Sequence, residues 1–373
     1  MDDIQAGDPV MKMPQLRAAR YTGSRGFTLT ELMISLTIGL FVLGGMLSFF
    51  SNSSNAYAEL KKSAEHTGNG SMAMWMLSQD INHAGYYGEF YNLPPAGALP
   101  DPCAVAPAAI YTALAFPIQG YDAPAISPLT CLSDANLVPG TDILVVRYAE
   151  FVSLAAANVP VTGEVYLQAS TLGAEVQIGA GGTAVGTTKK ANGSPATLFK
   201  KDGISAADIR KLAVHIYFVA PCSVPADGTE TCTGPADDGG RPIPTLKRLE
   251  LTSIGGVTGW VIAPVVDGIR NLQIDYGIDN APAVRDPATD QFGDGAPDVY
   301  VTAPAVADWT NVVSVRINFI AVSTQLTSRY VDTKTYNLGL AGPVGPFNDA
   351  FKKHMFAGTA RLVDVSGRRE IPQ

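Results

Sequence analysis

The sequence predicts an α+β protein in which one long N-terminal helix packs on a mainly antiparallel β-sheet head with large loop insertions. A mostly apolar run at residues 27–50 begins the helix, and apolar residues at helical spacing continue it. Strand-like runs then follow one another without intervening helices, which favours antiparallel pairing. A chain of 373 residues is long enough to bury a substantial core.

The composition limits the classes of partner. A net charge of −8 and a pI near 5.0 argue against a nucleic-acid binder, which needs a basic surface to neutralise phosphates. We therefore expect no nucleic-acid partner. The 37 glycines and 26 prolines follow no repeat, so they predict long loops rather than a low-complexity chain.

The apolar run Phe27–Phe50 has the length of a membrane-spanning helix. Its 24 residues extend about 36 Å as a helix and exceed the about 7–15 residues of a secretory signal core. Four basic residues precede it, so the positive-inside rule keeps the N-terminus in the cytoplasm and exports the chain from about Ser51. Glu31 lies inside the run, where a carboxylate costs roughly 2.5–3.5 kcal/mol at the membrane centre, so this residue needs a partner.

The heptapeptide RGFTLTE, residues 25–31, resembles the type IV prepilin signal. In that family a basic leader ends in glycine, here Gly26, and the mature chain starts with phenylalanine, here Phe27, and has glutamate at its fifth position, here Glu31. The resemblance implies that a prepilin peptidase cuts between Gly26 and Phe27 and methylates the new amino terminus. It also implies that Glu31 pairs with the amino terminus of a neighbouring subunit and so sets the register of assembly. An uncut signal anchor is the alternative.

This interpretation divides the chain into four parts. Residues 1–26 are the cleaved basic leader, 27–50 the transmembrane and assembly half of the helix, 51–85 its periplasmic half, and 86–373 the β-rich head with inserted loops. Three acidic residues near the start are unusual for such a leader, so we expect the true start to be Met11.

The second half of the helix carries a face for packing. Met74, Leu77 and Ile81 recur at helical spacing, and the Met and Trp residues of this segment are expected in the core. Gly68 and Gly70 each weaken a helix by about 1 kcal/mol, so we expect a bend or a loosened turn there.

The head is predicted from period-2 patterns and from a second resemblance. Strand-like runs lie at 141–151, 164–170, 174–180, 211–220, 245–253, 259–266, 268–278, 311–324 and 360–366. The segments 77–88, 268–279, 298–323, 336–339 and 356–365 resemble the helix end and the C-terminal half of PilW-type minor pilins.

The two resemblances together imply a minor pilin, a non-catalytic structural subunit that helps to initiate a type IV pilus at or near the fibre tip. The implied partners are other minor pilins, the major pilin, the prepilin peptidase and the inner-membrane assembly machinery. The implied location is the inner membrane, with the head in the periplasm, and later the pilus at the cell surface. The alternatives are a minor pseudopilin of a type II secretion system and a tip adhesin.

The four cysteines, Cys103, Cys131, Cys222 and Cys232, all lie in the part expected to be exported. Two local bridges, Cys103–Cys131 and Cys222–Cys232, are the simplest of three possible pairings. A structural zinc site is disfavoured because there is no C-x-x-C pair and the four histidines are scattered.

One acidic loop is a candidate calcium site. Asp290, Asp294 and Asp298 surround two glycines, and hard oxygen ligands on a turn suit calcium. The loop lacks the EF-hand pattern, so a solvated acidic turn is the alternative. Catalysis is not expected, because the chain has no nucleophile elbow, P-loop or H-E-x-x-H motif. No cofactor other than structural calcium is predicted.

Overall fold

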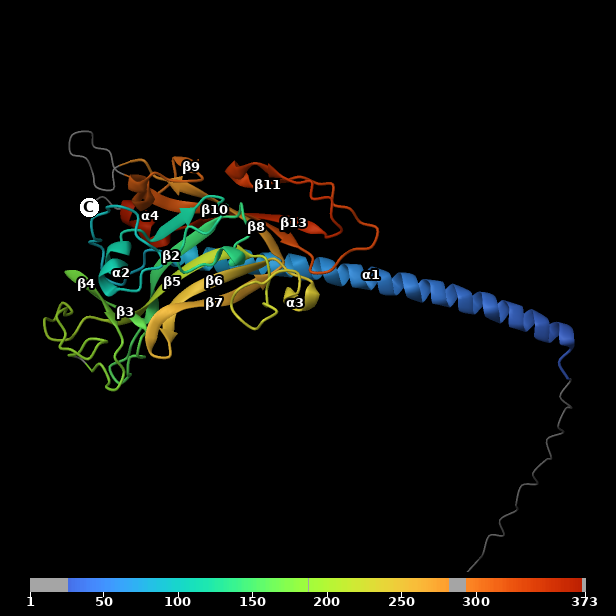
Figure 1. Cartoon of the computed structure of the whole chain (residues 1–373), viewed down its shortest axis with the longest axis horizontal. Coiled ribbons are helices and arrows are strands. Elements are labelled where there is room, and N and C mark those ends of the chain that lie inside the picture. Colours follow the sequence, from blue (N-terminus) through green and yellow to red (C-terminus); the bar gives the residue numbers. More distant parts are fainter. Residues whose placement is uncertain (1–25, 187, 282–292, 371–373) are drawn as a thin grey trace, which may run out of the picture. The chain divides into compact units, whose positions relative to one another are not determined.

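The computed structural model describes residues 26–186, 188–281 and 293–370. The chain forms two compact units, Met1–Ala58 and Glu59–Gln373. One helix, α1 (Leu29–His83), contributes to both (Figure 1). Within the described residues α1 is the one helix that is long and apolar enough to cross a membrane.

The part of α1 in the first unit buries nothing. Between residues 26 and 50 no side chain is buried, and Phe27, Phe41 and Phe49 are among the most exposed apolar residues of the chain. This number of exposed apolar side chains on one helix is unfavourable in water. The segment therefore requires lipid or other apolar helices around it.

A seven-stranded antiparallel sheet forms the larger part of the second unit (Figure 1). Its central strand β5 pairs with β2 along one edge, and β3 and β6 share the other edge. Strand β1 extends the sheet beyond β2, β4 beyond β3, and β7 beyond β6. The strands are β1 (Ile118–Tyr121), β2 (Ile143–Ser153), β3 (Val165–Ser170), β4 (Gly173–Ile178), β5 (Ile209–Ala220), β6 (Thr245–Ile254) and β7 (Val257–Asp267).

A second antiparallel sheet has the strand order β13-β10-β8-β9, and β11 and β12 form a small ribbon. These strands are β8 (Ile269–Ile278), β9 (Val299–Val301), β10 (Val312–Val322), β11 (Tyr336–Asn337), β12 (Pro343–Val344) and β13 (Lys353–Arg361). The shorter helices are α2 (Pro107–Ala113), α3 (Asp237–Gly240) and α4 (Val363–Glu370), with 3-10 turns at Asp134–Asn136, Val306–Asn311 and Gly339–Ala341. A long apolar helix with antiparallel sheets confirms the predicted α+β architecture.

Two apolar clusters form the core, one on each face of the seven-stranded sheet. Alternate side chains of β2 divide between them: Leu144 and Val146 face the cluster that contains α1 and the second sheet, whereas Ile143 and Val145 face the cluster that contains α2. The sheet is therefore buried on both faces, which explains why its central strands are apolar throughout rather than alternating.

Helix α1 meets the first of these clusters along a narrow stripe. Ala73, Leu77 and Ile81 are fully buried there, so two of the three predicted face residues are central contacts. The expectation that the Trp and Met residues lie in the core is wrong for Trp75 and Met72, which are 56% and 47% exposed. They lie on the side of the helix that the sheets do not cover.

The bend or loosened turn expected at Gly68 and Gly70 is absent, because α1 continues as a helix through both residues. Gly70 is buried, and a Cβ atom at this position would lie 2.1 Å from the ring of Phe356 on β13. Gly68 has nothing within 4 Å of such an atom. Gly70 therefore allows close approach of the helix to the second sheet, which outweighs its weak helix propensity.

The C-terminal segment differs from the prediction. The run at 360–366 was expected to be a strand, but β13 ends at Arg361 and α4 begins at Val363. Alternation over so few residues fits either structure. In α4 the buried Val365 reaches the first cluster, and Ser366 donates to the Leu362 carbonyl at 2.8 Å.

Candidate functional site

The N-terminus of α1 is closed by reciprocal hydrogen bonds between Thr28 and Glu31. The Thr28 amide and hydroxyl donate to Glu31 Oε2 at 3.0 and 2.9 Å, and the Glu31 amide donates to Thr28 Oγ1 at 3.3 Å. This is a capping box, which satisfies backbone N–H groups that have no partner inside the helix. Sequence reasoning missed this role of Thr28, although the T-L-T-E spacing is its known signal.

The cap uses only one oxygen of Glu31. Both bonds to the carboxylate end at Oε2, and Oε1 accepts none from the described residues. The carboxylate therefore stabilises its own helix and still presents an acceptor one turn from the Gly26–Phe27 bond. A fixed anion at a membrane-embedded helix start would attract a cation, such as an amino group, strongly. The structure thus gives Glu31 a local partner that the sequence analysis did not foresee and leaves its register role a prediction.

A buried polar network joins α1 to the seven-stranded sheet. Asp80 accepts hydrogen bonds from Tyr148 on β2 at 3.0 Å and from Tyr217 on β5 at 2.6 Å. The Asp80 Oδ2 atom, which accepts from Tyr217, also lies 2.5 Å from His215 Nδ1 and 3.8 Å from the Arg248 guanidinium. The helix is therefore attached to three strands through one carboxylate.

Charge pairing keeps this carboxylate ionised. Burial alone would raise the pKa of Asp80, but the hydrogen bond and charge of His215 and the bond from Tyr217 lower it on balance. Burial and the neighbouring Asp80 charge raise the pKa of Tyr217 well above its usual value, so the phenol remains a donor. His215, which the sequence analysis left isolated, thus belongs to a structural network between a helix and a sheet. None of the described residues around it is a serine or cysteine nucleophile.

A second set of polar contacts, one of them an ion pair, ties α1 to the segment after β10. Lys352 contacts Glu59 at 2.6 Å, Thr324 donates to Glu65 at 2.9 Å, and Lys62 donates to the Leu326 carbonyl at 2.9 Å. The hydrogen bond from Lys352, followed by that from Lys62, lowers the pKa of Glu59 to about 2. The helix thus has polar attachments at both ends of its packed stretch.

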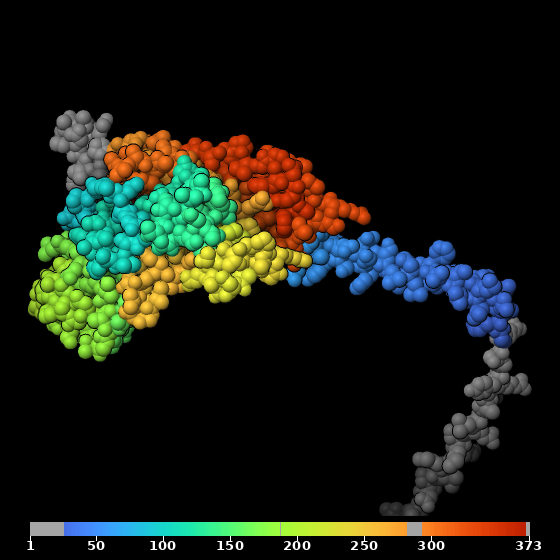
Figure 2. All heavy atoms as spheres, viewed as in Figure 1, coloured from blue at the N-terminus to red at the C-terminus, as the bar shows by residue number. Residues whose placement is uncertain are grey.

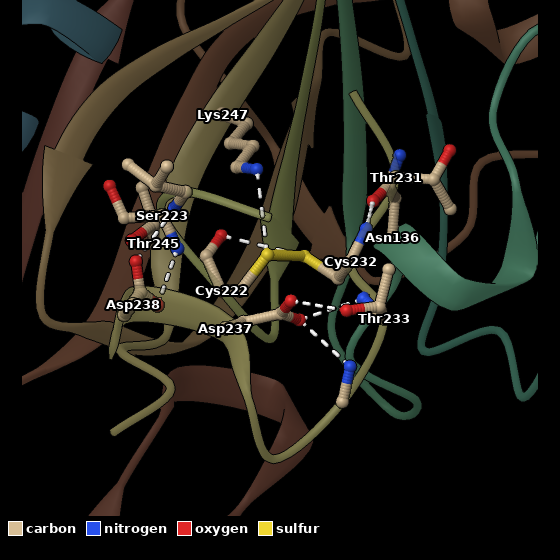
Figure 3. The surroundings of a disulfide bond; sticks show 12 residues. Asn136, Cys222, Ser223, Thr231, Cys232, Thr233, Asp237, Asp238, Thr245 and Lys247 are labelled. Atoms are coloured by element: carbon tan, nitrogen blue, oxygen red, sulfur yellow. Dashed lines mark hydrogen bonds between the residues drawn. A yellow bond between two sulfur atoms is a disulfide. The ribbon is translucent and has the colours of Figure 1, made fainter. Parts of the chain in front are cut away.

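The cysteines form the two local disulfides expected from the sequence, Cys103–Cys131 and Cys222–Cys232. Figure 3 shows the surroundings of the second. The Cys232 amide donates to Asn136 Oδ1 at 2.8 Å, and Lys247 Nζ lies 4.0 Å from Cys222 Sγ. The bridge is buried in the second apolar cluster. It links the residue just after β5 to the loop before β6.

Asp237 organises that loop (Figure 3). Its carboxylate accepts from the Thr233 hydroxyl at 2.6 Å and from the amides of Thr233, Gly234 and Ala226 at 2.7, 2.8 and 2.8 Å. These hydrogen bonds, the Thr233 hydroxyl first, lower the pKa of Asp237 to about 2. The residue was not singled out from the sequence, because its donors follow no recognised motif.

The predicted calcium ligands are only partly placed. Asp290 lies outside the described residues. Asp294 accepts from the Ala296 amide at 2.9 Å, and Asp298 accepts from the Asn280 amide at 2.8 Å. Neighbouring Asp279 lies 3.3 Å from the Arg369 guanidinium, which already supplies a positive charge. Calcium binding here stays a prediction.

Within the described residues, one group of potential metal ligands gathers, namely Cys222, Cys232 and Asp237. Both sulfur atoms are in the disulfide, so neither is a thiolate that could bind a metal ion. The donor set does not fit a zinc centre.

An exposed apolar helix with a capped acidic start, joined to an antiparallel α+β unit, defines the class of pilin-like proteins. Residues 22–47 match the model of the prokaryotic N-terminal methylation motif, so the chain carries a prepilin-type signal. Residues 233–364 match the model of type IV pilus-assembly protein W, and this confirms the PilW-type resemblance. That match covers α3 and β6–β13, and therefore all four strands of the second sheet. No curated protein and no solved structure matches the chain.

Proposed function

We propose that this chain is a minor pilin, a non-catalytic structural subunit that helps to initiate or cap a type IV pilus. The observation that carries the proposal is Glu31. A carboxylate held at the start of the otherwise uncharged apolar segment 27–50, with one oxygen left for a partner, is suited to pairing and not to anchoring.

The proposal has a defined topology and set of partners. The N-terminus begins in the cytoplasm, the second unit lies in the periplasm, and the prepilin peptidase releases Phe27 as the mature amino terminus. Other minor pilins, the major pilin and the inner-membrane assembly machinery are the partners. A position near the fibre tip is supported by length, because the 347 residues from Phe27 to Gln373 exceed what a repeating fibre subunit needs.

Three variants separate the two roles of Glu31. Glu31→Gln keeps a side chain that can complete the capping box but removes the charge. Thr28→Val removes the hydroxyl of the cap but keeps the charge. Glu31→Val removes both and should insert into the membrane at least as well as the wild type, because a costly carboxylate is gone.

The measurement is recovery of each variant in sheared fibres, normalised to its amount in the membrane. If charge pairing sets the register, Glu31→Gln and Glu31→Val should fall at least tenfold and Thr28→Val should assemble. If capping is the role, Thr28→Val should fall and Glu31→Gln should not. Cleavage before Phe27 should persist in all three. Wild-type recovery of Glu31→Val would contradict the proposed pairing.

The same experiment distinguishes the alternative of a type II secretion pseudopilin. A wild-type chain that is processed at Phe27, is absent from pili and is required for secretion would favour that alternative. If cells that lack the protein make a normal number of pili but no longer attach to surfaces, a tip adhesin would be favoured.

A further inference from the structure

The seven-stranded sheet ends in a long strand that has a partner on one side only. β7 pairs with β6 and with no other strand in the described part of the chain. The two strands are joined by Gly255 and Gly256, both with positive φ, which is the two-residue type I′ hairpin. Figure 2 shows the atoms of β7, coloured orange-yellow, at the surface of the face drawn.

The hairpin geometry determines which backbone groups of β7 point outward. In a two-residue hairpin the flanking residues, Ile254 and Val257, exchange both hydrogen bonds, and every second pair does so along the ladder. The alternate residues on β7 are Thr258, Trp260 and Ile262. Their N–H and C=O groups therefore face away from β6, and no other backbone group among the described residues bonds to them. Pro264 ends this row of donors.

Before Pro264, the residues of β7 do nothing to prevent another strand from pairing. From Val257 to Val266 the strand has no charged side chain, whereas natural edge strands are usually protected by charges, covering elements or short length. The other edges are protected in this way: β1 and β9 are short, β4 packs against α2, and β13 has the exposed His354 and Arg361. Among the described strands, β7 is the long edge that lacks such protection, from Val257 up to Pro264.

We propose that β7 is a docking strand, and that its free edge binds an extended, uncharged, β-branched or aromatic strand of another pilus subunit. The added strand would pair with the outward groups of Thr258, Trp260 and Ile262 and extend the seven-stranded sheet. The inference rests on the proposed function, because it takes the partner from the pilus assembly.

A second copy of the chain does not fit this edge. Symmetric antiparallel pairing of two β7 strands requires a two-fold axis perpendicular to them, and that axis reverses every element that runs along β7. In Figure 1, β6 and β7 run along the same general direction as residues 59–83 of α1. Residues 59–83 of two such copies would point in opposite directions, whereas the second units of subunits in the proposed fibre all point the same way.

The first test uses Ile262→Pro in the full chain, expressed in its host. Proline at this position removes one outward donor and leaves the bonds between Val261 and Glu250 in place, as Pro264 already does one register further. The matched control is Val257→Pro, which removes a donor that β6 uses and should unfold the hairpin. A second edge variant, Val261→Lys, places a charge beside the docking strand without changing the backbone. Ile262→Pro and Val261→Lys should lower recovery in sheared fibres at least tenfold at unchanged membrane level, processing and disulfide content.

The second test needs no substitution. Amide hydrogen exchange of the wild type should show slow exchange at Thr258, Trp260 and Ile262 only when the chain is in the fibre, while Val261 is slow in both states. Equal exchange of the three outward amides in both states would overturn the docking strand, as would wild-type recovery of folded Ile262→Pro and Val261→Lys.

A photoreactive amino acid at Val257, which is 70% exposed on β7, identifies the occupant, with the same group at Leu172, which is 90% exposed on the β3–β4 hairpin, as control. A cross-link from position 257 to another pilin supports the proposal, and one to a second copy overturns it. The two proposals fail separately: a wild-type chain that never enters fibres contradicts the pilin function, whereas a wild type and edge variants that enter equally contradict only the docking strand.

Discussion

Gly70 and Gly68 show how one residue type has two different roles on the same helix. Gly70 lies under the Phe356 ring, and Gly68 faces open space. A helix gains about 1 kcal/mol when glycine becomes alanine, unless the new methyl group collides with a neighbour. Overpacking a core site typically costs about 1–3 kcal/mol. At a crowded position this cost outweighs the gain in helix propensity.

We therefore expect opposite results from one substitution at the two positions. Gly68→Ala should stabilise the second unit by about 0.5–1 kcal/mol, and Gly70→Ala should destabilise it by about 1–2 kcal/mol. Urea unfolding of the detergent-solubilised chain, followed by near-ultraviolet circular dichroism, measures both. A shift of the midpoint in the same direction for both variants would show that the contact with Phe356 does not matter.

The low pKa of Asp237 makes a prediction about pH. Its value falls from the usual 3.8 to about 2 in the folded chain because the Thr233 hydroxyl and three amides donate to the carboxylate. A group with a depressed folded pKa stabilises the fold above its unfolded pKa, and this stabilisation is lost as the pH falls through the folded value.

Asp237→Asn should therefore be less stable than the wild type at pH 7, and the difference should shrink between about pH 4 and about pH 2. Thr233→Val, which removes the strongest donor, should move this window toward pH 4. Thermal midpoints measured across this range for the three proteins provide the check. A difference that does not vary with pH would mean that the hydrogen bonds do not depend on the carboxylate charge.

At the scale of elements, the two disulfides close loops of different length, 28 and 10 residues apart in sequence. The loop-entropy model assigns roughly 3–4 kcal/mol to the longer loop and roughly 2–3 kcal/mol to the shorter. Both bridges lie in the second apolar cluster and away from the α1 contacts.

Reduction should consequently loosen the sheet and its loops while α1 keeps its helical signal. Cys103→Ser/Cys131→Ser should lower the unfolding midpoint more than Cys222→Ser/Cys232→Ser. The comparison requires thiol labelling to show that the wild type has no free cysteine before reductant is added. Four labelled cysteines in the unreduced protein would contradict the bridges.

The sequence was most informative where one residue pattern determines one structure. The prepilin signal, the apolar helix, the strands and the packing of Leu77 and Ile81 follow from local spacing. Contacts between side chains that lie far apart in the sequence could not be predicted from local spacing. The fully buried Arg147, for example, donates to the Phe116 carbonyl and to Gln119, and nothing near it in sequence announces this.

The face of α1 that the sheets leave uncovered was also not predictable. Trp75 is as apolar as its buried neighbours, and only the crossing of helix and sheets decides which side is exposed. The capping box at Thr28 was, in contrast, available from the sequence, because its four-residue signature is local.

At the scale of the whole molecule, the two units require different surroundings: the first has an apolar surface, and the second has a buried apolar core. One apolar helix requires lipid or other helices, and one mixed unit has a conventional core with disulfides and ion pairs. The family matches cover the start of the first and the C-terminal part of the second. The residues between 48 and 232, which contain the β3–β4 hairpin and its loops, match neither model.

The attachment of α1 also has a mechanical consequence. In the proposed fibre, tension acts along the helix of each subunit, and in the second unit β6 and β7 run in the same general direction as residues 59–83 of that helix (Figure 1). Such a pull acts on the ladder between β6 and β7 in shear, so all of its hydrogen bonds resist together, whereas a pull across the strands would open them one at a time. The load enters through the Glu59, Gly70 and Asp80 contacts. The two disulfides lie in the second apolar cluster, apart from these α1 contacts, so the force would reach the sheet without passing through either bridge.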